Sequence, residues 1–545
     1  MHCATNCFHR YLPWSRRARV IADHASTAAV VRGSEQTPLD SDYVRDDSRN
    51  SALSSVPEIR IRCANSLPVR QDGDFVLYWM IASRRTTWNF ALDRAVEWAE
   101  KLHKPVVILE ALRCGYPWAS DRIHSFLLDG MAENASRLER AGVVYYPYLE
   151  PTRNAGKGLL AALAMRACVV VTDEFPCFFI PRMVASAARQ VPGMMEVVDS
   201  NGLLPLRQAE QTFPTAFAFR RFLQQELPRH LMDFPKADSL KGAKLPRAKL
   251  FLQEIEKRWP MASTRLLNSG RSELAGTSLD HGVAPVEARG GRRAAQTLLR
   301  SFLRKRLTNY AEARSEPEQR ATSELSPYLH FGHISAHEIF AGITRQEGWS
   351  SDHLAARATG SRTGWWGASP SIEAFLDQVI TWRELGFNMC HTRNNYDQFE
   401  SLPAWALKTL QEHAGDKRTH VYTLRQFEGA ATHDALWNAA QTQLVREGRV
   451  HNYLRMLWGK KIIEWTDTAE KALEIMMELN NKYALDGRDP NSYSGIFWCL
   501  GRYDRPWGPE RPIFGKVRYM SSENTARKFE VGNYVRRYSS PAKRD

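Results

Sequence analysis

Apolar and polar positions alternate in blocks along residues 75–198, and these blocks predict alternating strands and helices. Residues 75–81 and 106–109 are short, uninterrupted apolar runs, as expected of buried strands. Residues 87–103 and 121–141 carry apolar side chains at helical spacing. The alternation continues to residue 198. Because apolar strands that alternate with helices form parallel sheets covered on both faces, this region is expected to be a Rossmann-like α/β domain.

The turn after the first predicted strand lacks the glycines that usually hold a phosphate. It reads Ala82-Ser-Arg-Arg-Thr86, so no GxGxxG follows the strand, and the chain has no GxxxxGK[ST] loop. The domain is therefore expected to have a nucleotide-binding shape without the phosphate loop. Fold shape alone does not assign it a function.

The remaining segments predict a leader, a connector and a helical domain. Residues 1–65 have no sustained period and are expected to be poorly ordered. Prolines and a Gly-, Ser- and Arg-rich stretch at 270–293 favour a connector over residues 206–298. From about residue 299 to 545 the spacing predicts helices only, at 295–312, 335–346, 371–391, 433–445, 449–465 and 468–482. The α/β domain is then residues 66–205.

Charge and cysteine content narrow the class of protein. The formal net charge of +14 permits binding to nucleic acid but does not identify it. The eight cysteines are scattered without a CxxC pair, so neither a disulfide framework nor a metal site is predicted, and an intracellular location in the cytoplasm or nucleus is expected. No apolar run reaches the roughly 20 residues that cross a membrane. Four arginines in the first 20 residues leave organelle targeting open beside a disordered leader.

Residues 320–332 predict a loop that enters a helix. Thr322 and Ser323 precede Leu325-Ser326-Pro327. Hydroxyls and free backbone N–H groups at a helix start suit a phosphate, because that end of a helix is partly positive. Simple capping by Ser and Thr is the alternative.

Residues 450–465 predict a helix with two tryptophans on one face. Trp458 and Trp465 are seven positions apart, hence about 10 Å along the axis. A heptad-spaced core seam is the alternative, but Arg455 on the same helix requires a partner if it is buried. Residues 486–490 form a turn whose two carboxylates could pair with an arginine, or a loop with Asx turns.

These segments, in this order, resemble the photolyase and cryptochrome family, and specifically the class II cyclobutane pyrimidine dimer (CPD) DNA photolyases. The matching stretches are residues 432–441, 451–456, 458–465, 485–491 and 511–520. The resemblance covers about residues 58–535. It implies an N-terminal α/β domain, a long linker and an all-α C-terminal domain that binds FAD.

The resemblance also implies the flavin site. The residues implied to contact the FAD phosphates and ribityl chain are Tyr310, Thr322, Ser323, Leu325 and Ser326. The charged groups implied around the ring system are Arg383, Arg455 and Asp486, with Asn480 near flavin N5. The tryptophans implied to carry electrons are Trp437, Trp458 and Trp465, in an order that the sequence does not decide. A second antenna chromophore of the deazaflavin type is left undetermined.

The implied activity is light-driven DNA repair by electron transfer from excited, reduced FAD to a flipped-out pyrimidine dimer. Trp382 and Trp498 match the family's lesion-contacting tryptophans, and Asn452, Tyr453 and Met456 line the same opening. Gln378 stands where such enzymes usually place a glutamate, so it can donate an N–H but cannot supply a proton. Asp377, its neighbour, is expected to point elsewhere on the helix.

The partner implied is double-stranded DNA with UV-induced pyrimidine dimers, and a monomer without membrane association is expected. A cryptochrome-like photoreceptor without repair activity is the alternative, which Gln378 favours slightly. A basic helical nucleic-acid-binding protein without flavin would explain the charge but not the order of the motifs.

Overall fold

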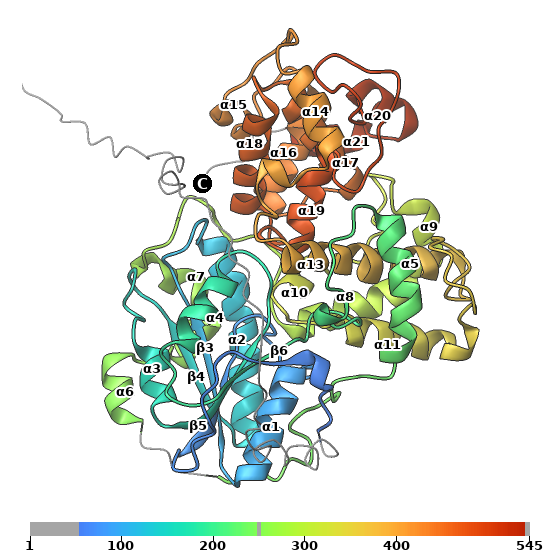
Figure 1. Ribbon diagram of the computed structural model, residues 1–545. Coiled ribbons are helices and arrows are strands. Elements are labelled where there is room, and N and C mark those ends of the chain that lie inside the picture. The colour runs from blue at the N-terminus through green and yellow to red at the C-terminus, as the bar shows by residue number, and fades with distance from the viewer. Residues whose placement is uncertain (1–53, 248–251, 540–545) are drawn as a thin grey trace, which may run out of the picture. The chain divides into compact units, whose positions relative to one another are not determined.

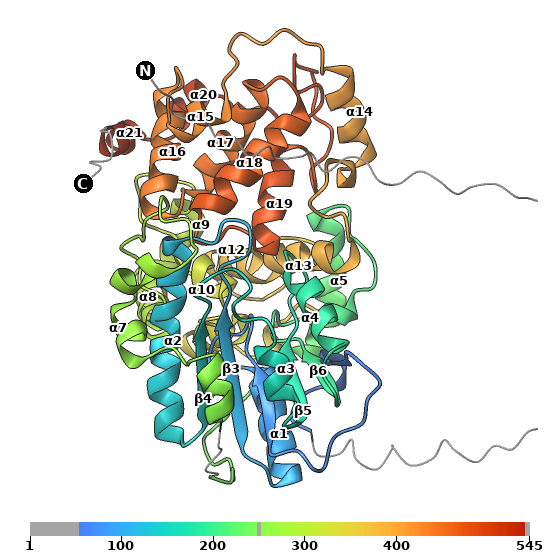
Figure 2. The same ribbon diagram turned by 90° about the vertical axis from the view of Figure 1, so that its left-hand side faces the viewer.

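A computed structural model of the protein describes residues 54–247 and 252–539 (Figures 1 and 2). Within these residues six strands form one sheet in the order β1-β6-β5-β2-β3-β4. All neighbouring strands are parallel except β1 and β6. The strands are β1 (Ile61–Cys63), β2 (Phe75–Trp79), β3 (Val106–Leu112), β4 (Val144–Leu149), β5 (Ala167–Asp173) and β6 (Met195–Val198). The predicted α/β domain with a mostly parallel sheet is confirmed.

The first strand lies inside the segment that was expected to be poorly ordered. β1 pairs antiparallel with β6, with Ile61 opposite Val198. The preceding Arg60 is fully buried, and its guanidinium donates to the carbonyls of Gly202 at 3.1 Å and Leu203 at 2.6 Å. The prediction is therefore wrong for residues 54–65, because an edge strand of three residues is too short to show an alternating pattern. The part of that prediction on residues 1–53 lies outside the described residues.

The strands read as continuous apolar runs because both faces of the sheet are covered. Along β2, Val76 and Tyr78 pack into the cluster that contains α1, while Phe75 and Leu77 pack into the cluster that contains α3 and α4. Asn89 begins α1 by accepting the N–H groups of the first turn. The helices of this domain are α1 (Phe90–Leu102), α2 (Asp121–Ala141), α3 (Leu159–Ala164) and α4 (Ile180–Ala188).

The missing phosphate loop has a structural explanation at the end of β5. The Asp173 carboxylate accepts the backbone N–H groups of Ile81, Ala82 and Ser83, at 2.8, 2.8 and 3.0 Å. Its other oxygen accepts the hydroxyl of Tyr78 at 2.7 Å. The donors that a nucleotide phosphate would use at this turn are thus occupied by a carboxylate of the protein.

The connector lies against other parts of the chain and has no core of its own among the described residues. Its helices are α5 (Ala216–Glu226), α6 (Gln253–Arg258) and α7 (Thr264–Glu273). α7 packs on α2, and α6 on α3. Trp259, which follows α6, is buried in the core beneath the sheet, and its carbonyl accepts the Tyr146 hydroxyl at 2.5 Å. α5 instead packs on the helical region.

The C-terminal region is helical, as predicted, and the described strands all precede residue 199. The predicted helix 371–391 is divided into α12, a π turn called η8 (Asp377–Trp382), and α13. The helices are α8 (Arg292–Lys305), α9 (Tyr310–Ala313), α10 (Ser326–His330), α11 (Ala336–Glu347), α12 (Pro370–Leu376), α13 (Arg383–Thr392), α14 (Ala404–Glu412), α15 (Leu424–Glu428), α16 (Ala435–Glu447), α17 (Asn452–Glu464), α18 (Ala469–Tyr483), α19 (Pro490–Cys499), α20 (Ser522–Lys528) and α21 (Gly532–Ser539). Across the described ranges, no helix combines the length and the apolar character needed to cross a membrane.

Candidate functional site

Three buried tryptophans form a continuous cluster on α16 and α17. The rings of Trp437 and Trp458 are nearly parallel, with an interplanar angle of 4° and centroids 6.5 Å apart. The rings of Trp437 and Trp465 are 6.0 Å apart at 69°. The Trp437 indole N–H donates to the Trp458 carbonyl at 3.0 Å, which fixes the two helices against each other. Trp437 is therefore the central member, which the sequence did not reveal.

The two ends of the cluster have different surroundings. Trp465 caps the C-terminus of α17, and its ring contacts Tyr422 at 5.7 Å and the exposed His433 at 4.9 Å. Trp458 lies at the other end, one helical turn after Arg455. The cluster thus runs from the neighbourhood of Arg455 towards the protein surface.

Arg455 and Asp486 form an ion pair between α17 and the loop after α18. Arg455 Nη2 and Asp486 Oδ1 are 3.0 Å apart, and the side chains are 20% and 15% exposed. The Arg455 Nε is buried without a hydrogen-bond partner in the structure. The partner that the sequence required for Arg455 is therefore present, and one guanidinium donor remains for another group.

Asn480 lies close to this loop at the end of α18. Its side chain is buried, and its amide N–H donates to the Ser492 hydroxyl at 2.6 Å. The loop turns tightly at Gly487, where a Cβ atom would lie 2.8 Å from the Asn480 carbonyl oxygen. Glycine is required there because no larger residue allows the loop to approach α18.

The segment before α10 has the loop-to-helix form that the sequence predicted, with Pro327 in the first turn of the helix. Thr322 and Ser323 are half-buried, Leu325 is buried and Ser326 is exposed. Glu324, between them, has a left-handed φ of 61° and is held by Arg320 at 3.0 Å and by Arg449. These ion pairs stabilise a backbone conformation that is unfavourable for glutamate.

Tyr310 and Arg383 are both buried, more deeply than residues on an open ligand-binding surface would be. The Tyr310 ring packs edge-on against Phe302 and Phe375, at 5.7 and 5.3 Å, and burial raises its pKa. Arg383 donates to the Asn201 carbonyl at 2.5 Å and lies over the Phe387 ring. Arg383 therefore joins α13 to the α/β domain, and its role at a flavin stays a prediction.

The π turn carries Gln378 and Trp382, both half-buried. The neighbouring Asp377 turns towards α5, where its Oδ1 lies 2.8 Å from Arg220 Nε. Its Oδ2 accepts the indole N–H of Trp382 at 3.2 Å. The sequence predicted only that Asp377 points elsewhere than Gln378. Its contact with Trp382 was not expected and arises because the segment is a π turn and not an α-helix. No pattern in the sequence indicated that turn.

The other residues expected at a lesion lie on α17 and α19. Asn452 is exposed on the first turn of α17, and Tyr453 packs on Phe529 at 4.5 Å. Met456 is half-buried one turn further along. Trp498 is half-buried on α19.

A basic surface beside Trp498 was missed in the sequence. The Arg518 guanidinium lies 5.9 Å from the Trp498 ring and 4.9 Å from the Trp507 ring. Arg505 covers Trp507 at 4.7 Å. The exposed cations of this surface are Arg505, Arg511, Lys516 and Arg518. In the sequence, the alternation of these basic residues with aromatic residues over 505–519 could have predicted this surface.

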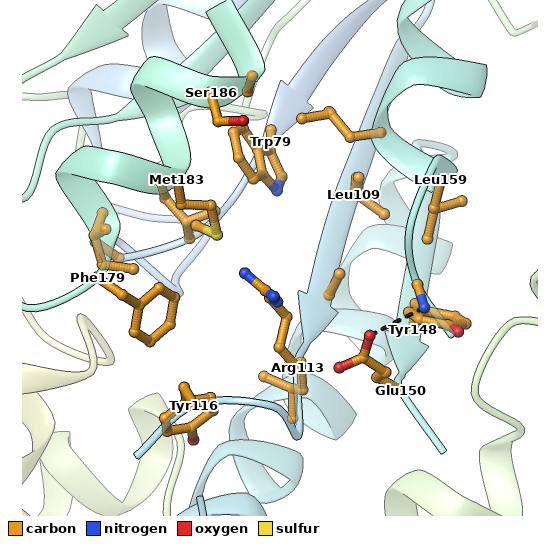
Figure 3. A pocket seen from close by; sticks show the side chains of 18 of the residues that line it. Trp79, Leu109, Arg113, Tyr116, Tyr148, Glu150, Leu159, Phe179, Met183 and Ser186 are labelled. Atoms are coloured by element: carbon orange, nitrogen blue, oxygen red, sulfur yellow. Dashed lines mark hydrogen bonds between the residues drawn. The ribbon is translucent and has the colours of Figure 1, made fainter. Parts of the chain in front are cut away.

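A separate pocket of about 360 Å³ opens at the carboxyl ends of β2, β3 and β4 (Figure 3). Its wall is mostly apolar and includes Trp79, Leu109 and Met183. Figure 3 shows the Arg113 guanidinium pointing into it. Glu150, also in the wall, accepts the backbone N–H of Gly156 at 3.0 Å. The sequence did not reveal this pocket because its lining residues come from many separate elements.

Comparison with known proteins identifies the family. The chain is 35% identical over 483 residues to a deoxyribodipyrimidine photo-lyase of Methanothermobacter thermautotrophicus, covering 88% of this chain and 97% of that protein. It is 33% identical over 507 residues to the photo-lyase of Potorous tridactylus, covering 90% and 87%, and 32% identical over 481 residues to that of Arabidopsis thaliana, covering 86% and 89%. No protein-family model matches. The chain belongs to the deoxyribodipyrimidine photo-lyase family of enzymes.

A solved structure supports the fold independently. The crystal structure of a bacterial class III photolyase from Agrobacterium tumefaciens matches 87% of each chain with a TM-score of 0.57 and 20% identity. At that identity the match shows the fold alone. The class II assignment stays a prediction.

Proposed function

We propose that this protein repairs cyclobutane pyrimidine dimers in DNA in a light-driven reaction, as a class II enzyme of its family. The observation that carries the proposal is the chain of three contacting, buried tryptophans, which leads from Trp465, beside the exposed His433, to within one helical turn of the Arg455–Asp486 pair. Packing of the core alone does not require three tryptophan rings in contact with one another beside an ion pair whose arginine has an unused hydrogen-bond donor. The relatives' shared name, deoxyribodipyrimidine photo-lyase, supports the same reaction.

The residues around the pair have the chemistry to hold FAD. The unpartnered Arg455 Nε is a buried donor, and a flavin ring offers carbonyl and nitrogen acceptors. Asn480 adds an uncharged amide, which can hydrogen-bond either redox state of flavin N5. The half-buried hydroxyls of Thr322 and Ser323 would contact the phosphates. When bound and reduced, FAD would supply, under light, the electron that opens the dimer and would then recover it.

The chain's own residues would hold the dimer in a flat, partly apolar pocket. Trp382 and Trp498 would stack against the extruded bases, and Gln378 would donate an N–H to a pyrimidine carbonyl. A glutamine cannot supply a proton at that position, so reduced repair efficiency is expected. The exposed cations around Arg518 would bind the phosphates of the flanking DNA.

The tryptophans would carry the electron that restores an oxidised flavin to its active state. Trp458 would be the first donor because it is the member nearest Arg455 along α17. Trp437 would reduce it in turn, followed by Trp465 at the outer end, and an external reductant in solution would then reduce Trp465.

The pocket in the α/β domain fits a second, antenna chromophore of the deazaflavin type. Its volume of about 360 Å³ and apolar wall are typical of a site for a flat aromatic ligand. Arg113 and Glu150 would provide polar anchors at its edge. We also propose that the protein is a monomer.

A light-dependent repair assay on duplex DNA with one cyclobutane dimer tests the function, with a (6-4) lesion as the specificity control. Repair of the cyclobutane dimer in light but not in darkness is expected. A protein that binds flavin and changes its redox state in light, yet leaves the dimer intact, would act as a photoreceptor, and the proposal would be wrong.

A further inference from the structure

The Trp382 ring is held by a carboxylate that nothing in the proposed function uses. Asp377 Oδ2 accepts the Trp382 indole N–H at 3.2 Å, and its Oδ1 pairs with Arg220 Nε at 2.8 Å. The Arg220 and Asp377 side chains are only 5% and 10% exposed. Trp382 itself is half-buried, so packing restrains it incompletely. A hydrogen bond to a charged acceptor is therefore a large part of what orients this indole.

The backbone geometry shows why this contact exists. In an α-helix, residues five positions apart lie about 140° apart around the axis and cannot meet. In a π turn, residue i is hydrogen-bonded to residue i+5, so the two lie near the same side. Asp377 and Trp382 are the first and last residues of η8. The π turn thus brings the carboxylate under the indole, and such turns are frequent at functional sites.

Arg220 fixes the carboxylate from outside the helix. It extends from α5, and its guanidinium also donates to the Gly360 carbonyl at 3.4 Å. On the same face of α5, Gln224 accepts the Gly360 N–H at 2.7 Å and donates to the Ser361 carbonyl at 3.0 Å. α5 is therefore anchored to two parts of the helical region, which makes Arg220 a rigid partner for Asp377.

We infer that Asp377, held by Arg220, is a positioning residue that sets the orientation of the Trp382 ring in the wall of the dimer pocket. This inference rests on the proposed function, because it assigns Trp382 to the dimer. Asp377 does not touch the dimer in this scheme. It acts through Trp382, and its loss should weaken recognition of the lesion without weakening contacts to undamaged DNA.

The test is the ratio of the dissociation constants for intact duplex and for duplex with one cyclobutane dimer, measured in darkness. Asp377→Ala should lower this preference for the dimer about tenfold, with the affinity for intact duplex and the flavin content unchanged. Asp377→Asn keeps an oxygen for the indole but loses the charge, so a loss of about threefold is expected. If the alanine variant does not fold, the asparagine variant carries the test alone.

A matched control is available in the α/β domain. Glu196 also pairs with an arginine, Arg94 at 2.8 Å, and accepts an indole N–H, that of Trp98 at 2.8 Å. Glu196→Gln should destabilise the fold as Asp377→Asn does, but it should leave the preference for dimer DNA unchanged. A similar loss of preference in both variants would mean general destabilisation and would overturn the inference.

A double-mutant cycle tests whether Asp377 acts through the indole. In a Trp382→Phe background, which has no indole N–H, Asp377→Ala should change the preference less than twofold. Independent effects of the two substitutions, or an unchanged preference in both Asp377 variants, would overturn the inference. A wild-type protein that does not distinguish dimer from intact DNA would instead refute the proposed function.

Discussion

Replacing Asp486 by alanine removes the charged partner of Arg455. The pair is 3.0 Å apart, and its side chains are 20% and 15% exposed. Breaking a fully buried pair costs roughly 3–5 kcal/mol because one charge remains without compensation, whereas exposed pairs contribute at most about 1 kcal/mol. With this intermediate exposure, we expect the free energy of unfolding to fall by about 2–3 kcal/mol in Asp486→Ala.

The same substitution should remove bound flavin, because Asp486 shares the tight loop that ends beside Asn480. Denaturant unfolding measures the stability, and the visible absorbance of the purified protein measures the flavin content. Glu338→Ala is a suitable control, since Glu338 pairs with Arg292 at 2.8 Å with side chains 8% and 25% exposed. It should lose comparable stability and keep its flavin. A stable Asp486→Ala variant with full flavin occupancy would refute the assignment.

Four further outcomes are expected. Trp458→Phe should slow flavin photoreduction most because Trp458 is the proposed first donor, and Trp437→Phe should also slow it because Trp437 links the other two tryptophans, while chemically reduced enzyme should repair normally; wild-type photoreduction rates in all variants would make the cluster structural. Burial raises the pKa of Glu384 to about 7, so the folded state keeps a proton that the unfolded state loses above its ordinary pKa of 4.5. The free energy of unfolding should therefore decrease by up to about 3 kcal/mol as the pH rises from below 4.5 through 7, and unfolding curves of Glu384→Gln should lack this slope. Binding to DNA should weaken steeply with salt, and Arg518→Ala should reduce the slope of log K against log salt concentration by about one; an unchanged slope would remove Arg518 from the phosphate contacts. Arg113→Ala should lower the occupancy of an added deazaflavin, measured by its fluorescence, without changing FAD content.

Local patterns were sufficient for most of the fold. The parallel sheet was predicted from the uninterrupted apolar runs at β2 and β3 and from the helical spacing of α1 and α2. A strand that is buried on both faces needs apolar residues at successive positions, and this pattern is visible in the sequence. The motifs on α17 and in the 485–491 loop likewise indicated the family. A short segment with a specific set of residues can be recognised without knowledge of the tertiary structure. The need of Arg455 for a partner also followed from the sequence, because a buried cation is costly alone.

Other features depend on where separate elements meet. β1 has three residues, too few for a pattern, and it is a strand only because β6 pairs with it. Trp437 is central because α16 packs beside α17, whereas sequence spacing related only Trp458 to Trp465. The contact of Arg220 with Asp377 and the pocket lined by strands, helices and loops arise from packing between distant segments, and the π turn at Asp377–Trp382 has no signature in the sequence pattern. The sequence by itself determined which chemical groups are present and which local elements carry them. The tertiary structure alone decided which groups touch, because contact between distant residues is set by the packing of whole elements and leaves no periodic trace along the chain.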